Sequence, residues 1–173
     1  MLTLTNGMLL YHGSFTQVSE IDLNKCKQGK DFGRGFYVTS SYEQAQGFVP
    51  LSVNKQVNEE RLPTGTTIGY ISVFKLHMNP GIAIHLFNAA DRNWLHFVAS
   101  NRRRTLFPDV RERYAKFDII GGKIADDQTA RTLQLYTTPT KPNSLSTPGW
   151  RRRSPRIAVR GRNVARPPSR CLR

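Results

Sequence analysis

The sequence LYHGS at residues 10–14, followed by DFGRGFYVT at residues 31–39, decides the expected fold. The first segment places a histidine, a glycine and a hydroxyl after an apolar run, which favours a buried strand over residues 8–12 that Gly13-Ser14 then breaks. The second places two glycines directly before aromatic and β-branched residues, which is typical of a loop that leads into another strand. The two segments therefore predict two strands, each flanked by glycine.

Outward from these segments, the chain alternates short strands with helices. Apolar runs predict further strands at residues 68–76, 82–84 and 117–122. Helices are expected from Ser40 or Ser41 to about Pro50, over residues 88–101, and from residue 124 to about 136. Because this order has no βαβ rhythm, it predicts an α+β fold and argues against a doubly wound sheet.

The charge of the chain is concentrated at one end. The 173 residues carry a formal net charge of +14, and residues 139–173 hold 10 of the 26 Lys and Arg residues with no Asp or Glu. Ordering such a segment costs ~1–2 kcal/mol per residue of backbone entropy, and it has few large apolar side chains to bury in return. We therefore expect a folded domain over residues 1–137 and a disordered, basic tail over residues 138–173. Such a tail can contact nucleic acid without sequence preference.

Several classes of site and location are not indicated. Cys26 and Cys171 have no metal or redox spacing, which fits a reducing compartment without a disulfide framework. The histidines share no ligand spacing, so no metal is expected. The N-terminus does not look like a secretory signal, and no run approaches the ~18 apolar residues of a membrane span. A cytoplasmic protein without membrane contact is expected.

The motifs His12-Gly13-Ser14 and Phe32-Gly33-x-Gly35-x-Tyr37 resemble the NAD-binding core of the ADP-ribosyltransferase superfamily, in particular its poly-ADP-ribose-polymerase-like branch. The segments WLHFVASNR at residues 94–102 and FDIIGGKIADD at residues 117–127 narrow the resemblance. They are similar to a bacterial and phage family known only as a domain of unknown function within that superfamily. The resemblance covers roughly residues 8–137 and implies a split β-sandwich with flanking helices.

The resemblance also implies a role for each motif residue. His12 would bond the ribose beside nicotinamide, Gly13 would offer its backbone to the carboxamide, and Ser14 its hydroxyl. Nicotinamide would lie between the rings of Tyr37 and Phe48, in a cleft between the His12 strand and the Tyr37 strand. The expected catalytic residues are His12 and Tyr37, and the expected NAD contacts are His12, Gly13, Ser14, Phe32, Gly33, Gly35, Tyr37 and Phe48. Without the resemblance, the same residues describe a strand-end histidine, a glycine turn and core aromatics.

The activity that the resemblance implies is transfer of ADP-ribose from NAD to a macromolecular acceptor, protein or nucleic acid, with release of nicotinamide. A toxin-like role with an antitoxin partner belongs to the same expectation. The superfamily's third motif, a Glu or Gln on a late strand, has no counterpart, because no Glu follows Glu112 and the last glutamine is Gln134. Two alternatives therefore stand beside the enzyme: an inactive NAD- or ADP-ribose-binding remnant, and a basic module that binds nucleic acid through its tail. The Arg- and Pro-rich end leads to the hypothesis of a shifted reading frame from about residue 138.

Overall fold

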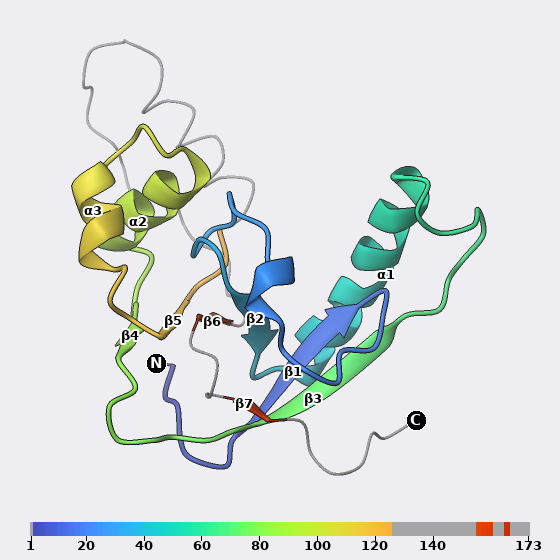
Figure 1. Ribbon diagram of the computed structural model, residues 1–173, viewed down its shortest axis with the longest axis horizontal. Helices are drawn as coiled ribbons and strands as arrows, with labels where there is room; N and C mark the ends of the chain where they lie inside the picture. Colours follow the sequence, from blue (N-terminus) through green and yellow to red (C-terminus); the bar gives the residue numbers. More distant parts are fainter. Residues whose placement is uncertain (1, 126–154, 161–164, 167–173) are drawn as a thin grey trace.

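The protein is described by a computed structural model over residues 2–125, 155–160 and 165–166. The strands in this part are β1 (Leu9–Ser14), β2 (Phe36–Thr39), β3 (Tyr70–Leu76), β4 (Ile84–Leu86), β5 (Ile119–Gly122), β6 (Arg156–Val159) and β7 (Ala165–Arg166). The helices are α1 (Tyr42–Asn58), α2 (Arg92–Arg102) and α3 (Pro108–Arg113), with a 3-10 turn η1 (Leu23–Lys25). The described strands form one mixed sheet in the order β4-β5-β6-β2-β1-β3-β7, with the helices outside it (Figure 1). The predicted α+β class is confirmed.

The sheet has a weak junction between β1 and β2. β1 pairs with β3 at six positions, from Leu9↔Lys75 to Ser14↔Tyr70. It pairs with β2 at one position, Tyr11↔Thr39. The predicted break at Gly13-Ser14 is wrong, because both residues continue the ladder with β3. The two halves of the sheet therefore meet at Tyr11 and separate beyond it.

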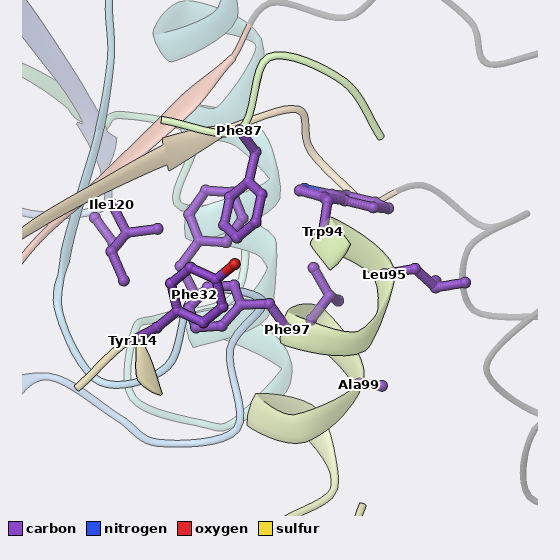
Figure 2. Packing of buried hydrophobic residues seen from close by; sticks show 10 residues of the cluster. Phe32, Phe87, Trp94, Leu95, Phe97, Ala99, Tyr114 and Ile120 are labelled. Carbon is purple, nitrogen blue, oxygen red and sulfur yellow. The ribbon is translucent and has the colours of Figure 1, made fainter. Parts of the chain in front are cut away.

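Two apolar clusters cover the two faces of the sheet. Ile119 and Ile157 belong to one cluster, while the next residues along the strands, Ile120 and Ala158, belong to the other, as the alternation of side chains in a strand requires. The cluster on the α2 and α3 side is rich in aromatic rings (Figure 2): Phe32, Phe87, Trp94, Phe97 and Tyr114. The opposite cluster contains Leu10, Phe36, Val38, Phe74 and Leu76.

Helix α1 continues through Pro50 and does not end there as predicted. Ser41 caps its N-terminus by accepting a hydrogen bond from the backbone N–H of Gln44 at 3.1 Å. Pro50 has no N–H and so removes one helical hydrogen bond. The second half of the helix is nevertheless anchored, because Val53 is 1% exposed and Ser52 Oγ accepts a hydrogen bond from the N–H of Phe15. Tertiary packing therefore overrides the local signal.

Arg156–Val159 form strand β6, so the disorder predicted for residues 138–173 is wrong over this strand. It pairs with β2 on one side and β5 on the other, and Ile157, Ala158 and Val159 are buried. Residues 126–154, on which most of the last predicted helix and the start of the predicted tail fall, lie outside the described residues. Among the described helices, none has the length and apolar character to cross a membrane.

Candidate functional site

A cleft of about 1510 Å³ opens where β1 and β2 separate. Its walls come from these two strands, from α1 and from the loop between β1 and β2. Six of the eight predicted binding residues line it: His12, Gly13, Ser14, Gly35, Tyr37 and Phe48. The structure therefore brings both sequence motifs to one cavity.

Phe32 and Gly33 do not line this cleft. Phe32 is 1% exposed, and its ring lies in the core 6.1 Å from the ring of Phe97, centroid to centroid (Figure 2). Gly33 has a φ of +81°, and a Cβ there would lie 2.6 Å from Oδ1 of Asn101. These two residues shape the loop that enters β2, and glycine is needed at position 33 for its backbone conformation.

The backbone of Gly13 faces the gap between the strands. The N–H of Leu76 donates to the carbonyl of Met8 at 2.8 Å. In this register the even-numbered residues of β1 are the ones whose backbone N–H and C=O groups bond to β3. In an antiparallel ladder the intervening residues, Tyr11 and Gly13, then direct their N–H and C=O groups toward β2. Because the β1–β2 ladder has no pair beyond Tyr11↔Thr39, the peptide groups of Gly13 open onto the cleft.

Gly13 also lets α1 approach β1. A Cβ at residue 13 would lie 2.0 Å from the carbonyl oxygen of Ala45, which is backbone of the helix. Only glycine allows this contact. The close approach places the first half of α1, with Gln44 and Phe48, along the wall of the cleft.

His12 bridges the two separated strands. Its Nδ1–H donates to the carbonyl oxygen of Tyr37 at 2.7 Å, since a carbonyl can only accept. Burial lowers the pKa of His12; the bond to Tyr37 raises it, and the charge of Arg156 lowers it further. The imidazole is therefore neutral near pH 7, with its proton on Nδ1 and Nε2 left as a hydrogen-bond acceptor. The ring lies 4.4 Å from that of Phe36, centroid to centroid.

The hydroxyl of Tyr37 is already engaged. It accepts a hydrogen bond from the N–H of Phe32 at 2.9 Å and donates one to the carbonyl of Gly33 at 2.8 Å. Burial raises the pKa of this phenol well above its ordinary value. Tyr37 therefore offers the cleft its ring and not a titrating group.

Phe48 and Arg156 meet at the cleft. Phe48 is 36% exposed and so is not a core aromatic. The guanidinium carbon of Arg156, on β6, lies 4.7 Å from the centre of its ring, within the range of a cation–π interaction. Sequence reasoning missed Arg156, because nothing in the sequence separates it from the other arginines of the basic segment.

The cleft is electropositive. Its described lining holds six basic residues, Lys25, Lys27, Lys30, Arg61, Arg102 and Arg156, against three acidic ones, Glu20, Asp22 and Asp31. Asp31 is bound by Arg102 through Nε at 2.8 Å and Nη2 at 2.7 Å. The pKa of Lys30 is lowered first by burial and then by the cations Lys55 and Arg156. This surplus of positive charge suits an anionic ligand.

Comparison with known proteins gives a family without an assigned function. The family described as "Protein of unknown function (DUF3990)" matches residues 8–144, a range that includes every predicted site residue and ends before β6. A search of curated proteins found no match. The predicted membership of a domain-of-unknown-function family is confirmed. With most of its length matched, this chain belongs to the DUF3990 family.

Proposed function

We propose that this chain binds NAD in the cleft between β1 and β2 and transfers ADP-ribose from it to a macromolecular acceptor, protein or nucleic acid, with release of nicotinamide. One observation carries the proposal: His12 and Tyr37 are 25 residues apart in sequence, yet they line one cavity and are joined by a hydrogen bond. The proposal also rests on the resemblance to ADP-ribosyltransferases in the two motifs.

The gap beside Gly13 suits the nicotinamide end of the ligand. A primary carboxamide has one acceptor and two donor hydrogens, so it can bond the cleft-lining N–H and C=O of Gly13 as a strand residue would. The ring would then lie between Tyr37 and Phe48, where aromatic stacking contributes about 0.5–1.5 kcal/mol beyond area burial. The hydroxyl of Ser14 is a further partner for the carboxamide.

The remaining parts of NAD suit the rest of the cleft. The Nε2 of neutral His12 can accept a hydrogen bond from a ribose hydroxyl. The pyrophosphate carries two negative charges, and basic side chains such as Lys30 bind phosphate oxygens through charge-assisted hydrogen bonds. The cleft thus has a neutral acceptor for the sugar and positive charge for the phosphates.

The proposed reaction breaks the bond between nicotinamide nitrogen and ribose carbon. Nicotinamide leaves as a neutral molecule with the bonding electron pair, and the ribose carbon becomes an oxocarbenium-like centre. A nucleophile of the acceptor bonds to that carbon and gives up its proton to solvent. The cleft contributes by binding and orienting the dinucleotide, and interactions that favour the charge of the transition state raise the rate.

A second candidate function is binding of NAD or ADP-ribose without turnover. The observation that favours it is the content of β6: Arg156, Ile157, Ala158 and Val159 bring neither a carboxylate nor an amide side chain. Arg156 lines the cleft, where a cation does not stabilise an oxocarbenium centre.

Calorimetric titration of the full chain with NAD tests the proposed site. His12→Ala should weaken binding more than tenfold, about 1.4 kcal/mol, while His77→Ala, at an exposed histidine outside the cleft, should not change it. Tyr37→Phe keeps the stacking ring and should keep most of the affinity. Equal affinities for the wild type and His12→Ala would refute the site.

A second measurement separates transfer from binding. The chain is incubated with NAD labelled in its adenylate half, together with protein and nucleic acid acceptors. Label on an acceptor and free nicotinamide support transfer. Tight binding without either product supports the binding function.

A further inference from the structure

We propose that Arg156 is a specificity-determining residue, which makes the cleft bind a dinucleotide with an uncharged ring more tightly than NAD, whose oxidised ring is a cation. The inference rests on the proposed function, because it requires the nicotinamide ring to lie against Phe48.

The position of Arg156 is the first support. Its guanidinium carbon lies 4.7 Å from the centre of the Phe48 ring. The face of an aromatic ring attracts cations, so Phe48 alone would favour a positively charged pyridinium. Because the guanidinium already occupies this face, an incoming pyridinium has to displace one cation or lie beside it.

The reach of the charge is the second support. Arg156 contributes to lowering the pKa of His12 on β1 and of Lys30 in the loop before β2. It also counteracts the rise in the pKa of Tyr37 on β2. These groups come from three segments that line the cleft, so the positive potential extends over the space assigned to the ring.

The chemistry of the two redox forms turns this potential into selectivity. NADH has the same carboxamide, riboses and pyrophosphate as NAD, but its dihydronicotinamide ring is neutral. The basic lining attracts the pyrophosphate of both forms equally. Repulsion between like charges in a partly enclosed cleft weakens only the oxidised form. The leaving nicotinamide and the ADP-ribose product also lack the ring charge, so Arg156 favours products over the oxidised substrate.

The test compares dissociation constants for NAD and NADH by calorimetry with the full chain. The wild type should bind NADH about tenfold more tightly than NAD, because the repulsion between Arg156 and the oxidised ring weakens the binding of NAD by about that factor. Arg156→Gln should bring the ratio close to one by strengthening the binding of NAD. Arg156→Lys keeps the charge and should retain the preference. Arg61→Gln is the matched control: it removes a cleft-lining charge that is paired with Glu59 at 3.3 Å, and it should leave the ratio unchanged.

Each outcome decides between the two proposals. A ratio that is the same in the wild type and Arg156→Gln overturns the role of Arg156 while leaving NAD binding intact. Failure of the wild type to bind either dinucleotide refutes the proposed function, and this inference with it. If Arg156→Gln does not fold, as judged by circular dichroism, Arg156→Met replaces it. This change also removes the charge while it keeps a long side chain beside Phe48, and an undiminished preference for NADH would again overturn the inference.

Discussion

Replacing Gly13 by alanine tests the contact on which the geometry of the cleft depends. The added Cβ would lie 2.0 Å from the carbonyl oxygen of Ala45 and 3.0 Å from its carbonyl carbon, far inside van der Waals contact. The obstructing atoms are helix backbone, so no side-chain rotation relieves the clash and α1 has to move away from β1. Overpacking of this kind costs about 1–3 kcal/mol and occasionally more, and here we expect about 3 kcal/mol.

The free energy of unfolding of Gly13→Ala is measured by urea denaturation and compared with that of Gly47→Ala. Gly47→Ala is the matched control, because Gly47 lies in α1, the helix that Gly13 contacts, and a Cβ at Gly47 meets nothing within 4 Å. It should stabilise the chain by about 0.5–1 kcal/mol, the usual gain from glycine to alanine in a helix. For Gly13→Ala, a loss of about 3 kcal/mol corresponds to a melting temperature lower by roughly 6–12 °C. Equal stability of Gly13→Ala and the wild type would refute the close approach of α1 to β1.

Two further predictions concern charge. Burial lowers the pKa of His12 from 6.5, so on acidification the imidazole takes up its proton in the unfolded chain before it does so in the folded one. The free energy of unfolding therefore falls as the pH drops from about 6.5 through the lower folded-state pKa. In urea titrations, His12→Gln should flatten the dependence of stability on pH between about pH 7 and pH 5, and an unaltered slope would contradict the lowered pKa. Asp31→Asn should lower the free energy of unfolding by about 1.5–3 kcal/mol, because Arg102 and Asp31 are only 27% and 16% exposed and share two charge-assisted hydrogen bonds. A double-mutant cycle with Arg102→Gln measures the coupling between the two side chains, and strictly additive effects would argue against the ion pair.

The sequence was sufficient for elements whose signals are local. The strand ending at Thr39, the serine cap before α1 and the strand around Val73 all follow from apolar periodicity and capping residues, and they appear as β2, α1 and β3. The meeting of His12 and Tyr37 in one cleft followed from their resemblance to a family pattern, not from periodicity. The fold class and the meeting of the two motifs could therefore be predicted from the sequence.

What escaped prediction depends on contacts between distant segments. Gly13 looked like a turn residue, but its lack of a side chain serves the packing of α1 while the strand continues. Phe32 looked like a ligand contact, yet the ring of Phe97 on α2 holds it in the core. Strand β6 has a three-residue apolar run within a basic, proline-rich segment, and only its pairing with β2 and β5 makes it a strand. Local composition cannot report such partners.

The insertion of β6 has a consequence for synthesis of the protein on the ribosome. Phe36 on β2 pairs with Val159 on β6 but is synthesised more than a hundred residues earlier. β5 also pairs with β6 and is synthesised before it. Until residue 159 has left the exit tunnel, β2 and β5 present unpaired backbone edges that can join other chains. Such late, long-range pairing is also slow to form. We therefore expect the nascent chain to depend on chaperones that shield these edges until β6 has been synthesised.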